Sequence, residues 1–302
     1  RAASSGNPER LAVDEQVTIG ISCESCHLGG RAHADGAKIS SLPAGAGVHV
    51  RADAPAMPAT FELQRKDAHV VNTICAQCHS GPSPRLADGT ALRNSSEALD
   101  LAAGPCTTLK CTDCHDPHVA DSRADEPRSI AACVRCHSQL AAPESATAHA
   151  GAGHSTSTCL DCHMPKIVMG IDRFVRTHRI SSPTNPQLLA EGSPNACNVC
   201  HLDRSIDWTL DELDRGWDTK LAKRVSTKVY RDNAVGEVWL ASKSPALRLV
   251  ATQAYARSPK LAAYVMPQLR KGLADPLAYV RAWTQLALDA LRAAQPKLPT
   301  AN

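Results

Sequence analysis

The sequence predicts a mainly α-helical protein with extensive coil, organised as two regions that meet near residue 202. Three observations support this prediction. All 13 cysteines and all 13 histidines lie between Cys23 and His201, whereas all four tryptophans and all four tyrosines lie after them. Sustained helical periodicity of apolar residues occurs only beyond residue 202. The earlier part is interrupted by Gly- and Pro-rich stretches that are typical of loops. The predicted domains are therefore residues 1–201 and 202–302.

A five-residue unit, Cys-x-x-Cys-His, dominates the first region. It occurs six times, as Cys23–His27, Cys75–His79, Cys111–His115, Cys133–His137, Cys159–His163 and Cys197–His201. A shuffled chain of this composition would contain only about 0.02 such units. The unit is the attachment sequence of c-type haem, in which two thiols bond to the vinyl groups and the histidine binds iron. The sequence therefore predicts six covalent haem c groups.

The predicted attachment uses twelve of the thirteen cysteines and leaves only Cys106. The cysteines expected to bind haem are Cys23, Cys26, Cys75, Cys78, Cys111, Cys114, Cys133, Cys136, Cys159, Cys162, Cys197 and Cys200. Zinc is the alternative, because paired Cys-x-x-Cys units also build zinc ribbons. Zinc, however, requires no histidine directly after every second cysteine. Disulfides are less favoured still, because cysteines three positions apart seldom serve as separate bridges along a whole chain.

Six porphyrins would also explain how the first region fills an interior. Phe61 and Phe174 are its only aromatic residues. Two such side chains supply little bulk for a core of about 200 residues. Residues 1–201 are therefore predicted to be a hexahaem cytochrome c domain whose cofactors form its core.

The elements of the first region are expected to be short. Residues 1–22 predict an irregular lead-in, and the Ala-, Gly- and Pro-rich residues 34–60 predict a loop. From Phe61 a short helix or strand should lead into the second motif. Ser95 or Ser96 should cap a short helix before the third motif. The third and fourth motifs begin only 22 residues apart, which favours two haems that lie close together.

The second region carries helix signals. Ile206, Leu210, Leu213 and Trp217 are spaced as on one face of an amphipathic helix. Three further starts place a capping residue before a proline at the first helical position. They are Ser244-Pro245, Ser258-Pro259 and Asp275-Pro276. Pro267 should kink or split the middle helix. Stacked antiparallel helices of a short solenoid are expected, with a plain helical bundle as the alternative.

Seven histidines lie outside the motifs and are candidates for the second axial ligand of each iron. They are His33, His49, His69, His118, His149, His154 and His178. Six irons need up to six such ligands, so the near match predicts two histidines at most or all haems. Of His149 and His154 at least one should bind, and a surface or propionate contact is the alternative for the other.

Iron with two histidine ligands has no open position for a substrate, so such haems transfer electrons. The leading prediction is an electron carrier with no catalytic residues, relaying electrons between redox partner proteins. A self-assembling conductive filament is a more specific form, in which His49 would bind a neighbouring molecule's haem. The alternative is an enzyme that reduces a small nitrogen or sulfur oxyanion at one open haem. The helical tail should dock a partner or cover the last haem.

Charge and hydropathy restrict the partners and the cellular location that the sequence predicts. The net charge is +3 and no block of Lys and Arg occurs, so no nucleic-acid partner is expected. No run of 18 apolar residues predicts a membrane span. The opening residues RAASSGNPER do not form a signal peptide. Because haem is attached outside the cytoplasm, we expect an export signal to have been removed and the protein to be periplasmic or extracellular.

The motifs resemble those of a known group. CESCH followed by Gly-Gly and a later histidine, CTDCHDPH and CLDCHMPK are similar to segments of pentahaem nitrite reductase, hydroxylamine oxidoreductase and the octahaem tetrathionate reductases. The resemblance covers roughly residues 20–202 and implies distal-ligand roles for His33, His118 and His178. PNACNVCHLDRS and the helices after it resemble haem proteins with a C-terminal HEAT-like tail, over residues 194–292.

The chain also departs from that group. All six motifs here end in histidine, whereas the nitrite reductases have a lysine at the catalytic haem. No tyrosine precedes Tyr230, whereas the hydroxylamine enzymes cross-link a tyrosine to theirs. These departures favour the electron carrier over the enzyme.

Overall fold

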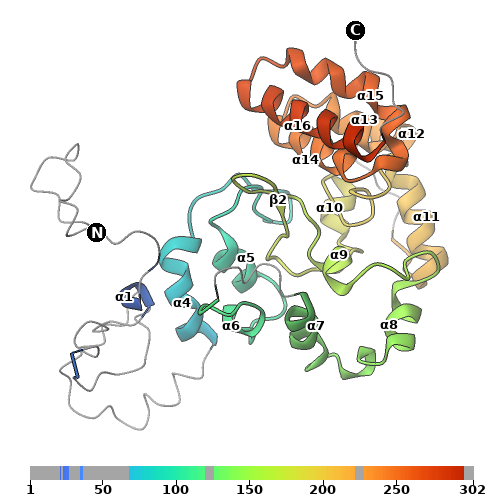
Figure 1. The fold of residues 1–302 in the computed structure, drawn as a ribbon. Helices are drawn as coiled ribbons and strands as arrows, with labels where there is room; N and C mark the ends of the chain where they lie inside the picture. Colours follow the sequence, from blue (N-terminus) through green and yellow to red (C-terminus); the bar gives the residue numbers. More distant parts are fainter. Residues whose placement is uncertain are drawn as a thin grey trace, which may run out of the picture. The chain divides into compact units, whose positions relative to one another are not determined.

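The computed structural model describes residues 21, 23–26, 35–36, 68–119, 126–221 and 228–295 (Figure 1). This part of the chain is mainly helical with much coil, which confirms the predicted class. Its β structure in named strands is one short antiparallel pair, β1 (Val168–Met169) and β2 (Phe174–Val175). The expectations for residues 1–20, 37–60 and 61–67 lie outside the described residues.

The chain divides into two compact units, residues 1–77 and 78–302. The boundary near residue 202 is a different division, between a region expected to bind haem and a region expected to bind none. It stays a prediction. In the first unit α1 (Cys23–Cys26) carries the cysteines of the first motif. Helix α4 (Ala68–His79) ends with the second motif.

Short helices form the part of the second unit that contains the remaining motifs. They are α5 (Glu97–Ala103), α6 (Cys111–Cys114), α7 (Glu126–Val134), η3 (Ser138–Leu140), α8 (Pro143–Ala150), α9 (Cys159–His163) and α10 (Pro186–Ala190). The predicted helix after Ser95 or Ser96 is α5, with Ser96 at the N-cap position. The Ser96 hydroxyl makes no capping bond and instead donates to the carbonyl of Gly81. The serine therefore ties the start of α5 to the loop after the second motif.

Longer helices follow residue 202. They are α11 (Ile206–Trp217), α12 (Lys228–Asp232), α13 (Val235–Leu240), α14 (Pro245–Ala256), η4 (Pro259–Leu261), α15 (Ala262–Lys271), η5 (Gly272–Ala274) and α16 (Ala278–Ala294). The predicted amphipathic helix is α11, and the predicted start at Pro245 is confirmed. Pro259 begins the 3₁₀ turn before α15. Pro267 does not split α15, which continues to Lys271.

One apolar core joins both sides of residue 202. Leu202 and Ile206 are fully buried together with Trp239 of α13, and the same core includes Phe174 of β2. The Phe174 ring meets that of Trp283 on α16 edge to face, with centres 5.7 Å apart. Helix α14 packs against α13, α16 and β1. The helices are therefore fixed directly to the segment between the last two motifs.

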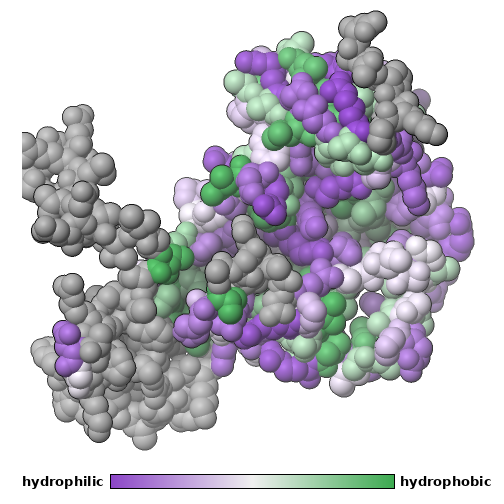
Figure 2. Space-filling view, viewed as in Figure 1, coloured by the Kyte–Doolittle hydropathy of each residue, from purple (hydrophilic) through white to green (hydrophobic). Residues whose placement is uncertain are grey.

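The surface is mixed. On the face shown in Figure 2, apolar residues form small patches separated by polar ones. Large exposed apolar side chains, such as Ile171, Val119 and Leu286, belong to different parts of the chain. Among the described helices, none combines the length and the apolar character needed to cross a bilayer.

Candidate haem sites

Each motif described in full folds as a tight helical turn, which brings its two thiols and its imidazole onto one short stretch of backbone. The amide of the motif histidine bonds to the carbonyl of the first cysteine, at 2.9 Å in His115 and 2.8 Å in His201. In two motifs an aspartate between the cysteines stabilises the turn. Asp113 and Asp161 accept the backbone N–H three residues earlier, at 2.8 and 3.0 Å. This is the reciprocal half of a capping box.

Three motif histidines lie opposite a histidine from outside the motifs. The pairs are His115 with His178, His163 with His149, and His201 with His154, each with ring centres 6.1 Å apart. Their planes differ by 24°, 8° and 79°, respectively. A metal–imidazole bond is about 2.0–2.1 Å, so imidazoles on opposite sides of one metal ion have centres about 6.3 Å apart. The residues therefore fit an iron with two axial histidines.

Hydrogen bonds select the tautomer of two motif histidines. His163 Nδ1–H donates to the carbonyl of Ser181 at 2.9 Å. His79 Nδ1–H donates to the carboxylate of Glu97, also at 2.9 Å. A histidine that binds a metal commonly donates its other ring N–H to such an acceptor. In both residues this assignment leaves the Nε2 lone pair for a metal.

Burial keeps several of these imidazoles neutral, which is the form that binds metal. Desolvation lowers the pKa of His163 and of His201. It lowers the pKa of His178 to about 4, against the opposing attraction of Glu97. These groups therefore present a free lone pair at neutral pH.

The third to sixth motifs neighbour one another in chain order. Burial, together with Cys159 of the next motif and Cys114 of the previous one, raises the pKa of the Cys133 thiol to about 11. Burial likewise raises the pKa of Cys197, with a further contribution from Cys162. Haems attached at these positions would be consecutive neighbours.

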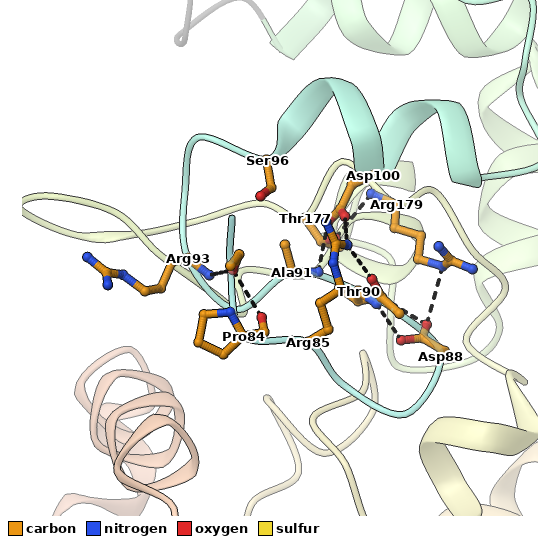
Figure 3. Close-up of polar contacts among 12 residues, drawn as sticks. Pro84, Arg85, Asp88, Thr90, Ala91, Arg93, Ser96, Asp100, Thr177 and Arg179 are labelled. Carbon is orange, nitrogen blue, oxygen red and sulfur yellow. Dashed lines mark hydrogen bonds and ion pairs between the residues drawn. The ribbon is translucent and has the colours of Figure 1, made fainter. Parts of the chain in front are cut away.

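A buried polar network positions the segment that carries His178 (Figure 3). Asp88 accepts from the backbone N–H of Thr90 at 2.9 Å and from the Asn185 amide at 3.0 Å. Arg179, the residue after His178, lies 3.7 Å from the same carboxylate. Because Asp88 is almost fully buried, these contacts tie two distant loops together and hold His178 against the third motif.

The three histidine pairs found among the described residues do not include His79, His118 or His137. The side chain of His118 is 78% exposed and lies 3.5 Å from Asp116. The iron-ligand roles predicted for His79, His118 and His137 stay predictions. His27, His33 and His49, and the side chains of Cys23 and His69, lie outside the described residues.

Sequence reasoning missed the groups that contact the candidate ligands. The Glu97 carboxylate and the Ser181 backbone carbonyl each accept a hydrogen bond from a motif histidine. The ring of Trp208 lies against the motif histidine His201, and the ring of Trp217 lies against His154. One signal was present: both tryptophans belong to the amphipathic helix directly after the last motif. Glu97 and Ser181 each lie 18 residues after the histidine that they contact, and neither belongs to a recognisable sequence motif.

No family model, curated protein or solved structure matches this chain. Within the described ranges, no three side chains of His, Cys, Asp and Glu converge on a common metal position. The candidate sites there are histidine pairs beside Cys-x-x-Cys units.

Proposed function

We propose that this protein is an extracytoplasmic multihaem c-type cytochrome that relays electrons along six covalently bound haems, most of them with two histidine ligands. One observation carries the proposal. Three motif histidines each face a non-motif histidine at the same 6.1 Å separation, which is close to that expected across one metal ion.

The surrounding residues suit electron relay. A haem iron supplies a one-electron change without bond making, provided that its axial ligands stay in place. Ser181 fixes the ring of His163, and the Asp88 network supports His178. Such supports limit reorganisation at each site. The neighbouring order of the third to sixth motifs favours short haem-to-haem steps.

The first test is the cofactor content of the purified, exported protein. We expect a red protein whose mass exceeds that of the polypeptide by six haem groups and whose haem survives denaturation. A colourless protein, or one carrying zinc in place of haem, would refute the proposal.

The second test removes proposed axial histidines one at a time. His149→Ala and His178→Ala should each leave one haem with a free axial position that binds CO when reduced. The wild type should bind none at these positions. Unchanged low-spin spectra in both variants would show that these histidines are not ligands.

The same spectra decide between carrier and enzyme. A high-spin ferric signal that shifts on adding nitrite would favour a reductase acting at one open haem. Six low-spin signals would exclude such a reductase.

Electron microscopy of the purified protein tests the filament form of the proposal. Finding only dispersed monomers would eliminate that form.

A further inference from the structure

Two tryptophans of α11 flank the histidine pair of the sixth motif. The ring centre of Trp208 lies 4.8 Å from that of His201, and the ring centre of Trp217 lies 5.8 Å from that of His154. The two tryptophans are nine residues apart, or about 13 Å along a helix axis. Helix α11 therefore runs alongside the pair, with one indole ring at each imidazole.

Trp217 also contacts the turn that joins His149 to His154. Its indole Nε1–H donates to the backbone carbonyl of His149 at 2.8 Å. The indole ring lies over Gly151, where an added Cβ would be only 2.9 Å from the ring. Gly151 has φ +80°, which also favours glycine. One side chain thus touches the segment that supplies the candidate distal ligands of two haems.

His154 has less polar support than His163 and His178, two of the other paired histidines. Its Nδ1 is buried and has no hydrogen-bond partner among the described residues. By contrast, His163 donates to Ser181, and His178 makes a backbone hydrogen bond with Arg176. Without such a bond, the ring plane of His154 depends on packing, and Trp217 is the aromatic ring packed against it beside its partner imidazole.

We propose that Trp217 is a positioning residue for the axial ligands of the fifth and sixth haems. Its ring sets the plane of His154, and its N–H holds the backbone of His149. This proposal rests on the proposed haem-binding function. It gives the helical region a role beyond covering the last haem, because α11 then determines the ligand geometry, and hence the electronic state, of two redox centres.

The test compares Trp217→Phe and Trp217→Ala with Trp283→Phe and Trp283→Ala in the full-length haem protein. Trp283 is the control, because its ring also packs against another aromatic ring, that of Phe174, but contacts no candidate ligand in the described chain. Haem content, low-temperature EPR of the oxidised protein and CO binding to the reduced protein are measured for each.

We expect six haems per chain in every folded variant, because the thioether bonds do not depend on Trp217. Trp217→Phe should shift the most anisotropic low-spin signal, which we assign to the near-perpendicular pair. Trp217→Ala should produce high-spin iron and CO binding at no more than two of the six haems. The Trp283 variants should keep the wild-type g-values.

The proposal is overturned if Trp217→Phe keeps the wild-type g-values, or if the Trp283 variants change them equally. Should Trp217→Ala fail to fold, the Trp217→Phe comparison decides alone. A wild-type protein without haem would instead refute the proposed function, so the two failures are distinguishable.

Discussion

The most direct prediction about a reduction potential concerns Glu97 and the proposed second haem. Its carboxylate accepts the Nδ1–H of His79 at 2.9 Å and the backbone N–H of Ser95 at 3.0 Å. Burial opposes its ionisation, but these hydrogen bonds outweigh that effect and lower its pKa to about 2. Ser95 itself has φ +72°, an uncommon conformation for serine that its contacts must stabilise. Glu97 is thus a fixed negative charge beside the predicted iron ligand of the second haem.

The perturbation is Glu97→Gln, which keeps an acceptor for His79 and removes the charge. The carboxylate would lie about 7 Å from an iron bound at Nε2, where one unit charge contributes about 1–2 kcal/mol at an effective dielectric constant of about 20–40. A negative charge favours ferric over ferrous iron, so its loss should raise the potential of the second haem. At 59 mV per tenfold change for one electron, the rise is about 40–90 mV. Because the His79 side chain is 52% exposed, the lower end is expected.

The assay is a redox titration followed by optical and EPR spectra, in which a single one-electron component should move. Asp289→Asn is the matched control, because it removes the same charge from α16, which carries none of the motifs. If no component moves further in Glu97→Gln than in Asp289→Asn, Glu97 does not tune the second haem. If several components rise together, the effect is long-range charge rather than the hydrogen bond.

Three further outcomes are expected. The 79° angle between the rings of His154 and His201 predicts one highly anisotropic low-spin EPR signal beside the rhombic signals of the near-parallel pairs, and His154→Ala should abolish that signal selectively. Asp275 accepts two hydrogen bonds from the Arg248 guanidinium, of 2.7 and 3.1 Å. Arg248 also donates to the backbone carbonyl of Ser242, so Asp275→Asn should destabilise the helical region by about 1.5–3 kcal/mol in thermal melts. Burial raises the pKa of Asp275, but its hydrogen bonds outweigh that effect, so the folded pKa lies below the unfolded value of about 4. The stability that Asp275 contributes should be complete above about pH 4 and lost as pH falls through the lower folded pKa; equal acid sensitivity in the variant would contradict this. Leu288→Ala, at a fully buried position, should cost about 2–5 kcal/mol, whereas Leu286→Ala, at a position 58% exposed, should stay within about 0.5 kcal/mol; equal losses would refute the described core.

Features encoded within a few consecutive residues could be predicted from the sequence. The Cys-x-x-Cys-His unit contains the predicted thiols and the first iron ligand within five residues, so its chemistry needs no knowledge of the fold. The amphipathic helix from Ile206 and the helix start at Pro245 are likewise local, because periodicity and proline geometry act within a few turns. Pro267, by contrast, lies inside α15 without splitting it, because tertiary packing overrides a local preference.

Only the tertiary structure decided which imidazoles face each other. The sequence left His149 and His154 unranked, and the fold brings each against a different motif histidine, 14 and 47 residues further along. His178 reaches back 63 residues to His115, with the Asp88 network supporting its loop. A motif specifies its own turn of backbone, but the second ligand comes from whichever distant segment the packed chain places opposite. That placement depends on the buried contacts of Asp88 and on the continuous apolar core, neither of which has a local sequence signature.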